Sequence, residues 1–354
     1  FHEEMGRLQR ETGTVRKKDL HMKPFETSLL GRMELNNRIG IPAMCTYMAK
    51  GDGIANLHHI AHYETLAKGR PAFIVQEATA IAAEGYISDA CLGIFTPRQR
   101  EPLKDIVEVV HDYGVKLGIQ LNHAGMKSKC AAHKVSAMDN EDVHALTAEE
   151  IHRIVVNFEF AGKWAKELGY DFVEIHAAHG YLINQFLSPL TNQRTDLYGE
   201  DRTLLLKEII TGVRSTFEKD VIVRISAEEY EEDGLHIADM KDIVEAIESC
   251  GAAAISVSSG GLNKHPIQTY PLYQIPYARA IKQMTSLPVM GVGLITKEEE
   301  IETILAQEDC DYVLLGRKLL RDPYFLLSWQ DAFGLLTEEN IGECLYRGIH
   351  KHGE

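Results

Sequence analysis

The sequence predicts a (β/α)8 barrel, an α/β fold, that forms a single domain. Short apolar, β-branched runs recur eight times, and each is followed by a segment with helical spacing of apolar residues. The runs are nearly continuous in apolar residues, as expected for parallel strands buried on both faces. The competing architecture, an open doubly wound sheet, normally carries a G-x-G-x-x-G turn after its first strand, and this sequence has none.

The predicted strands follow one another at regular intervals along the chain. In order they are Arg38–Met44, Ala72–Ala80, Lys116–Asn122, Asp171–His176, Val221–Ser226, Ala253–Ser258, Pro288–Gly291 and Tyr312–Leu315. The clearest predicted helix between them is Thr147–Leu168. Thr147 is its expected N-cap, with Glu150 three residues later in a capping-box pattern. Gly169 follows the helix, where a glycine commonly ends one.

The chain has 354 residues, and α/β barrels of this length commonly form one domain. Residues 23–330 are the predicted barrel and 331–354 a C-terminal tail. Residues 1–22 are polar, lack a sustained apolar period and do not begin with Met. We therefore expect them to be a vector-derived or disordered extension, although a native N-terminal arm is an open alternative.

Composition narrows the class of partner. The net charge is −15, and an acidic surface repels phosphate backbones, so we expect no nucleic-acid partner. No uncharged apolar run approaches the roughly 18 residues that span a bilayer, so we expect no membrane partner. The six cysteines form no C-x-x-C pair. Free thiols in the reducing cytoplasm are the simplest interpretation.

Barrel enzymes keep their active sites at the C-terminal ends of their strands, so the residues there are the candidates. The last two strands end in Gly291, Gly293 and Gly316, followed by Arg317. Glycines let backbone N–H groups approach a phosphate closely, and an arginine can pair with it through two hydrogen bonds. This position in the fold favours phosphate binding over the alternative of tight turns beside a surface arginine.

Two histidines follow the fourth strand, and Tyr181 lies close after them. His176 and His179 have three interpretations: a metal-binding pair, structural histidines, or two N–H donors aimed at one substrate oxygen. The first strand offers Met, Cys and Tyr instead of metal-binding carboxylates, which favours the donor pair and predicts no metal. Arg224 lies within an apolar strand and needs an anion. A salt bridge to Glu77 or Glu174 and a bound anionic group both remain open.

Three segments together resemble the old yellow enzyme family of FMN-dependent ene reductases. They are VEIHAAHGYLINQFLSPLTNQRTDLYG at 173–199, GIQLNHAG at 118–125 and LLGRKLLRDPYF at 314–325. The resemblance covers roughly residues 23–325. It points to the bacterial subgroup with a cysteine, here Cys45, at the end of the first strand.

The resemblance implies a role for each matching residue. FMN would contact Gln120 and Arg224 at its pyrimidine edge. Met44 and Ala78 would contact it through their backbone. Cys45 would lie close enough to tune the reduction potential of the flavin. Its phosphate would be held by Gly293, Gly316 and Arg317. The other cofactor-binding residues we expect are Ser259, Gly260 and Gly291. His176 and His179 would bind the substrate carbonyl oxygen, Tyr181 would protonate Cα, and Tyr47 would frame the substrate.

The activity implied is a ping-pong reduction of the C=C bond of α,β-unsaturated carbonyl compounds, with NADPH or NADH as hydride donor. A related flavin oxidoreductase acting on nitro or aromatic compounds and a metal-dependent barrel hydrolase using the two histidines are the alternatives. The family also implies a homo-oligomer, in which Arg347 is a candidate to reach a neighbouring active site. The sequence departs from the family pattern at Pro42-Ala43 and at the shortened stretch 199–202. These departures affect what the resemblance implies about the flavin contact and about the shape of the substrate.

Overall fold

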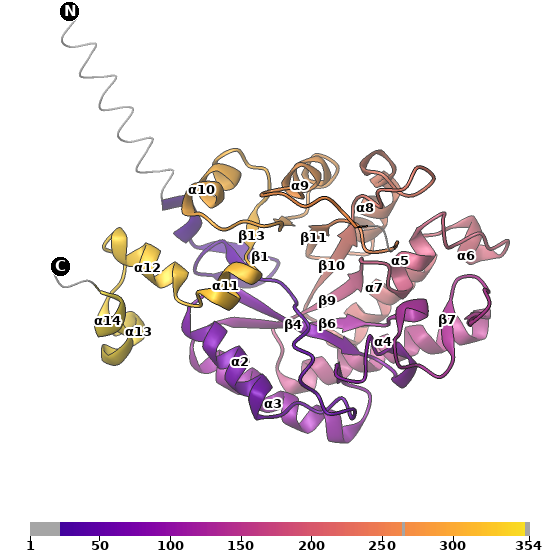
Figure 1. Cartoon of the computed structure of the whole chain (residues 1–354), viewed down its shortest axis with the longest axis horizontal. Helices are drawn as coiled ribbons and strands as arrows, with labels where there is room; N and C mark the ends of the chain where they lie inside the picture. The colour runs from indigo at the N-terminus through magenta and orange to yellow at the C-terminus, as the bar shows by residue number, and fades with distance from the viewer. Residues whose placement is uncertain (1–21, 264–265, 351–354) are drawn as a thin grey trace, which may run out of the picture.

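At the centre of the computed structural model is a closed barrel of parallel strands (Figure 1). The structure describes residues 22–263 and 266–350. The barrel strands are β3 (Ile39–Ile41), β4 (Phe73–Ala80), β6 (Lys116–Asn122), β9 (Phe172–Ala177), β10 (Asp220–Ser226), β11 (Ala254–Ser258), β12 (Val289–Gly291) and β13 (Tyr312–Leu314). Strand β3 pairs with β4 on one side and β13 on the other, which closes the ring. The predicted (β/α)8 barrel is confirmed.

The first strand is shorter than predicted, ending at Ile41 instead of Met44. Pro42 follows at once, and a proline has no N–H to continue the ladder of hydrogen bonds. The remaining barrel strands agree with the prediction to within one residue at each end. Differences of this size are ordinary at element boundaries.

Helices surround the strands as an outer layer (Figure 1). The main ones are α2 (Leu57–Lys68), α3 (Pro97–Asp112), α4 (Ala148–Leu168), α7 (Leu204–Phe217), α8 (Lys241–Ser249), α9 (Ile275–Lys282), α10 (Glu298–Ala306), α11 (Arg317–Arg321) and α12 (Phe325–Ala332). The predicted caps of α4 are confirmed. Thr147 and Glu150 form a reciprocal capping box, and Gly169 ends the helix in the left-handed conformation at φ +91°.

A short hairpin that sequence reasoning missed closes the N-terminal end of the barrel. It consists of β1 (Ser28–Leu30) and β2 (Met33–Leu35), which pair antiparallel. Its buried side chains pack against inward-facing residues of the barrel, including Phe73 and Phe172. The Tyr312 hydroxyl donates to Ser28 Oγ over 2.9 Å and ties the hairpin to β13. The hairpin fills the end of the barrel opposite the predicted active site.

The remaining elements are short and lie in the connections. They are the single-turn helices η1 (Lys23–Phe25), η2 (Ala83–Gly85), η3 (Gly125–Lys127) and η4 (Ile237–Asp239), the strands β5 (Leu92–Gly93), β7 (Lys134–Ser136) and β8 (Val143–Ala145), and the helices α5 (Leu182–Leu187) and α6 (Leu197–Glu200).

The two ends of the chain differ in how far they are described. Apart from Met22, the predicted extension 1–22 lies outside the described residues. The predicted tail contains α13 (Glu338–Ile341) and α14 (Glu343–Ile349). Arg347 is exposed on α14 and forms an ion pair with Glu343 one turn earlier. Its predicted reach into a neighbouring active site stays a prediction.

A glycine in the first strand makes room for an aromatic ring inside the barrel. A Cβ added at Gly40 would lie 2.3 Å from ring atoms of Phe73, which is itself fully buried. We expect Gly40→Ala to lower the free energy of unfolding by about 1–3 kcal/mol, the usual cost of overpacking a core. Gly348→Ala is the matched control, because nothing lies within 4 Å of the added carbon there.

Denaturant unfolding of the two variants measures this effect. Adding Phe73→Leu to Gly40→Ala should recover part of the loss, because the two sites share one space. Equal stability of Gly40→Ala and the parent protein would contradict the packing account.

Candidate active site

A cavity of about 370 Å³ opens at the C-terminal ends of the strands. Residues from the segments that follow β3, β9, β11, β12 and β13 line it. The structure therefore brings together side chains far apart in the sequence. The predicted site residues in its lining are Met44, His179, Arg224, Ser259, Gly293, Gly316 and Arg317.

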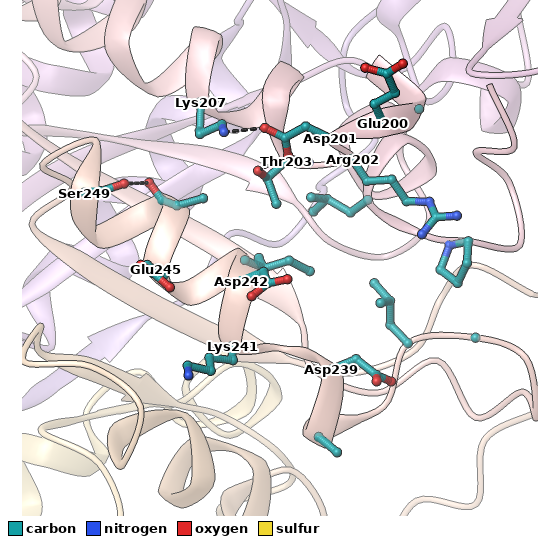
Figure 2. A pocket seen from close by; sticks show the side chains of 18 residues that line it. Glu200, Asp201, Arg202, Thr203, Lys207, Asp239, Lys241, Asp242, Glu245 and Ser249 are labelled. Carbon is teal, nitrogen blue, oxygen red and sulfur yellow. Dashed lines mark hydrogen bonds and ion pairs between the residues drawn. The ribbon is translucent and has the colours of Figure 1, made fainter. Parts of the chain in front are cut away.

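A larger hollow of about 900 Å³ lies outside the barrel, between the start of α7 and the segment of η4 and α8 (Figure 2). Its side chains carry both signs of charge, and Lys207 forms an ion pair with Asp201 there. None of the predicted site residues lines it. Size alone thus does not select the active site; the smaller cavity is where titratable groups with shifted pKa values converge.

The centre of the smaller cavity is a buried cation. The Arg224 side chain comes from β10, and only 7% of the residue is exposed. Its Nε has no hydrogen-bond partner among the described residues. Neither predicted salt bridge forms: Glu77 instead accepts hydrogen bonds from Thr46 and Tyr63. Burial lowers the pKa of Arg224, and the nearby Glu174 opposes that shift but makes no ion pair with it among the described residues.

Gln120 lies on β6, opposite Glu174 of β9 in the strand pairing. Its Nε2 donates to Glu174 Oε1 over 2.7 Å, and both residues are buried. Burial raises the pKa of Glu174, while Arg224 and Gln120 oppose that shift. Glu174 was not among the predicted site residues. It fixes the orientation of the Gln120 amide and places a carboxyl group behind the buried cation.

The other end of the cavity is basic and lined by glycine. Gly293 adopts φ +141°, and a Cβ there would lie 3.2 Å from the backbone N of Gln274. Gly316 precedes α11, and its added Cβ would lie 3.2 Å from Met44 Sδ. Arg317 is joined here by two cations that sequence reasoning missed, Lys318 and Arg321. Their position on the short helix directly after Gly316 was the available signal.

Two predicted glycines are not in the cavity lining. The Gly260 N–H donates to the Glu228 carbonyl over 2.7 Å, so it is already used. A Cβ at Gly291 would lie 2.9 Å from both Cys310 Sγ and Ile275 Cδ1, which shows close packing against α9. The cofactor-binding role of these two residues stays a prediction.

The predicted histidine pair and tyrosine lie together at the end of β9. The ring centroids of His176 and His179 are 5.0 Å apart, and those of His176 and Tyr181 are 4.9 Å apart. Burial holds the pKa of both histidines well below the ordinary value, and the nearby Arg224 and Lys127 charges act in the same direction. Both imidazoles are therefore neutral near pH 7, and each carries one N–H.

Hydrogen bonds orient the two imidazoles. His176 Nδ1 accepts from the Ala178 N–H over 3.3 Å, so its proton is on Nε2. His179 Nε2 lies 2.6 Å from Ser258 Oγ at the end of β11. Gln274 Oε1 accepts a hydrogen bond from Ser259 Oγ over 2.8 Å. Neither Ser258 nor Gln274 was among the predicted site residues, because a sequence does not show which residues meet across strands.

Lys127 joins three loops around this cluster. Its Nζ donates to the His179 carbonyl over 2.7 Å and to the Gly261 carbonyl, and it lies 5.1 Å from the Tyr181 ring centroid. Burial lowers its pKa. The structure thus adds a further cation, beside His179 and Tyr181.

The residues after β3 complete the site from the opposite side. Cys45 and Tyr181 pack against a small buried cluster that includes Ala78. Burial raises the pKa of Tyr181, so its hydroxyl keeps its proton near pH 7. Tyr47 is 52% exposed and adopts φ +54°. Glu77 holds this segment by accepting hydrogen bonds from the Thr46 N–H and hydroxyl, and burial raises its pKa to about 7.

The described residues contain no group of three or more His, Cys, Asp or Glu side chains arranged to hold a metal ion. Within the same ranges, no helix combines the length and the apolar character needed to cross a membrane.

A barrel that combines a buried guanidinium, a basic glycine-lined end and neutral imidazoles at one mouth defines an enzyme that binds an anionic nucleotide cofactor. Comparison with known proteins identifies the family to which this enzyme belongs. Residues 23–332 match the model of the NADH:flavin oxidoreductase / NADH oxidase family. The chain belongs to this family.

Relatives in sequence span nearly the whole chain. An NADPH dehydrogenase of Clostridium acetobutylicum is 42% identical over 320 residues, covering 87% of this chain and 94% of that protein. An NADPH dehydrogenase of Listeria monocytogenes is 40% identical over 326 residues, covering 89% and 96%. The chain is thus an oxidoreductase with FMN as cofactor and NAD(P)H as hydride donor, and the hydrolase alternative is set aside.

Solved structures match the fold. An old yellow enzyme homologue from Zymomonas mobilis superposes with a TM-score of 0.77 at 22% identity, covering 94% of this chain and 99% of that one. Morphinone reductase superposes with a TM-score of 0.75 at 22% identity, covering 90% and 93%. The resemblance inferred from sequence motifs is confirmed for the family. The cysteine subgroup stays a prediction.

The residues present fit FMN. The Nε of Arg224 has no partner among the described residues, so an anion beside it would stabilise the buried charge. The reduced flavin ring would supply that anion. The glycines at 293 and 316 leave room for a phosphate beside Arg317, Lys318 and Arg321.

We expect the imidazoles of His176 and His179 to stay neutral as the pH passes through about 6.5, where an ordinary histidine titrates. Two-dimensional NMR of the imidazole nitrogens measures this. His236 is the internal control, because hydrogen bonds to Glu232 and Glu228 raise its pKa. A titration of either site histidine near pH 6.5 would contradict the account.

The same shifts have a consequence for stability. The folded pKa of each histidine lies below the unfolded value, so the unfolded chain binds more protons in acid. The contribution of the pair is therefore complete above about pH 6.5 and is lost as the pH falls toward the folded pKa.

Proposed function

We propose that this enzyme reduces the C=C bond of α,β-unsaturated carbonyl compounds. The observation that carries the proposal is the cluster of two neutral, buried imidazoles with a protonated tyrosine beside them at the mouth of a flavoprotein barrel. Two N–H donors and one acid suit a substrate that develops negative charge on an oxygen and needs a proton at a neighbouring carbon.

FMN binding is assigned to two ends of the cavity. Gln120 and Arg224 would hold the pyrimidine edge of the flavin, and Arg317 with Gly293 and Gly316 would hold the phosphate. Met44 and Ser259 line the same cavity, and we also assign Cys45 and Ala78, which are not in its lining, to the flavin contact. FMN bound there would supply hydride transfer from NAD(P)H to the substrate. The nucleotide and the enone use the same opening in turn, in a ping-pong sequence.

His176 donates to the carbonyl oxygen of the substrate through its Nε2–H. His179 donates through Nδ1–H, with the Ser258 hydroxyl donating to its Nε2 over 2.6 Å. This polarises the conjugated system and makes Cβ electrophilic. Because both imidazoles start neutral, they act as hydrogen-bond donors and not as acids. The Lys127 ammonium group, held by two backbone carbonyls, adds positive potential where the oxygen gains charge.

Tyr181 delivers the proton to Cα. Its raised pKa keeps the hydroxyl protonated until the substrate carbon has gained charge, and then favours return of a proton from solvent. Tyr47, which is half-exposed above the cluster, forms the outer wall of the substrate position.

The wider assignments are also proposals. The relatives named NADPH dehydrogenase favour NADPH over NADH. The net charge of −15 argues against nucleic acid as a partner. The six cysteines are free, which suits the reducing cytoplasm. A homo-oligomer is proposed from the family.

Removal of the tyrosine hydroxyl separates the two half-reactions. We expect Tyr181→Phe to leave reduction of the flavin by NADPH unchanged and to slow enone reduction by about 10²–10⁴-fold, the usual contribution of a general acid. Stopped-flow absorbance measures both steps. The control is Tyr86→Phe, the same change at a neighbouring side chain whose hydroxyl binds Gln99. Equal losses in both half-reactions would rule out the proton-donor role.

Loss of one imidazole should weaken phenol binding. A phenolate resembles the oxygen of the product enolate, and a hydrogen bond to a charged group contributes about 1.5–3 kcal/mol. We therefore expect His176→Ala to weaken phenol binding by at least tenfold, measured by the change in flavin absorbance, while FMN stays bound. The exposed His144→Ala is the control. Unchanged phenol affinity in His176→Ala would sink the donor-pair assignment.

A further inference from the structure

A tight turn joins two of the residues assigned to the proposed reaction. His179 and Gly180 both have positive φ angles, +60° and +73°, in the segment between β9 and α5. A left-handed backbone is unfavourable for a residue with a side chain, so the surrounding structure must hold it in place. The turn sets the spacing between His179, which is assigned to the substrate oxygen, and Tyr181, which is assigned to the proton.

Both peptide groups of Gly180 are bound by side chains of α5. Its N–H donates to Asn184 Oδ1 over 2.7 Å, and its carbonyl accepts from Gln185 Nε2 over 2.7 Å. Asn184 and Gln185 are both buried. A backbone N–H can only donate, so the Asn184 atom that meets it has to be the oxygen. The amide nitrogen of Asn184 is thereby left to face a different partner.

That partner is a buried carboxylate from the segment after β10. Asn184 Nδ2 donates to Glu229 Oε1 over 3.1 Å. Glu229 Oε2 accepts from Ser188 Oγ over 2.7 Å and from the Leu235 N–H over 2.8 Å. Only 3% of Glu229 is exposed; burial raises its pKa, and these three hydrogen bonds oppose that shift. All three partners are donors, which suits an ionised carboxylate because it can only accept.

We propose that Asn184 and Glu229 are positioning residues for the proposed reaction. Glu229 fixes the direction of the Asn184 amide, and Asn184 holds the turn that places His179 and Tyr181. The inference rests on the proposed roles of these last two residues. Neither Asn184 nor Glu229 is in the lining of the cavity at the mouth of the barrel, so their effect passes through the Gly180 N–H.

The direction of each hydrogen bond makes the pair sensitive to exchange of a single atom. Glu229→Gln keeps the shape but replaces one oxygen by an NH2 group. Whichever way the new amide lies, that group meets a donor, either Asn184 Nδ2 or the Leu235 N–H. Rotation of the Asn184 amide does not help, because its own NH2 group would then meet the Gly180 N–H. Asn184→Asp instead places a second carboxylate against Glu229.

The double variant Asn184→Asp/Glu229→Gln restores every hydrogen bond, with the direction of one reversed. The introduced carboxylate accepts from the Gly180 N–H and from the new NH2 group. The carbonyl oxygen of the introduced amide accepts from Ser188 and Leu235. The negative charge is moved and not removed. The two single variants and the double variant thus separate the hydrogen-bond pattern from the shape and charge of the pair.

Phenol binding to the flavoprotein, followed by flavin absorbance, tests the proposal. We expect each single variant to weaken phenol binding by about tenfold, because an unpaired buried donor or charge has a cost of this order. The double variant should restore the affinity of the parent enzyme. The rate of cyclohexenone reduction should change in the same order, with the FMN content of all variants unchanged.

Ser188→Ala is the matched control. It removes another hydrogen bond of the same carboxylate but leaves the contacts of Asn184 with Gly180 and Glu229 in place. We expect it to lower the midpoint of denaturant unfolding while the phenol affinity stays at the parent value. A general loosening of the structure would instead lower both.

Three outcomes would overturn the proposal: single variants that bind phenol like the parent, a double variant that does not fold or binds as weakly as the single variants, or an equal loss of affinity in Ser188→Ala. If a single variant does not fold, the double variant and Ser188→Ala decide by the same criteria. A parent enzyme that binds no phenol contradicts the proposed function itself. A parent that binds phenol beside unchanged single variants contradicts this inference alone.

Discussion

A guanidinium group buried at the mouth of the barrel sets the requirement that the rest of the site meets. Arg224 is surrounded by apolar strands, and its Nε has no partner within the described structure. Removing a charge from water costs several kcal/mol unless an opposite charge compensates it. Glu174 compensates only in part, because its carboxyl group is bonded to Gln120. Such a site favours a bound group that becomes negatively charged next to Arg224, as the flavin does when it is reduced.

The same positive potential explains the state of the other catalytic groups. Arg224 and Lys127 both act to hold the histidines neutral, after burial, which is the larger effect. Neutral imidazoles donate hydrogen bonds without giving up a proton, so in the proposed mechanism the proton for carbon comes from Tyr181. The hairpin of β1 and β2 fills the opposite end of the barrel. This leaves one mouth of the barrel open, and in the proposed mechanism nicotinamide and substrate use it in turn.

The barrel and the residues that gather at its mouth could be predicted because their signals are local. Each strand is an apolar run, and residues such as His176, His179 and Arg224 stand in or directly after one. Contacts across strands could not be predicted in this way. Ser258 meets His179 from another strand, and Lys127 reaches His179 and Gly261 from a third segment. At Gly260 and Gly291 the structure shows that a glycine after a strand also serves a backbone hydrogen bond or close packing, so a glycine by itself does not identify a ligand site. The three-residue strands of the hairpin carry no usable period.

The visible absorption spectrum of the purified protein, before and after anaerobic NADPH, tests the central claim most directly. The account predicts a two-banded flavin spectrum that bleaches with NADPH and returns on adding cyclohexenone. A flavin that bleaches but does not respond to cyclohexenone, and responds instead to a nitro compound, would contradict the assigned substrate while leaving the cofactor in place. A protein that stays colourless when FMN is supplied would contradict the whole account, beginning with the anion assigned to Arg224.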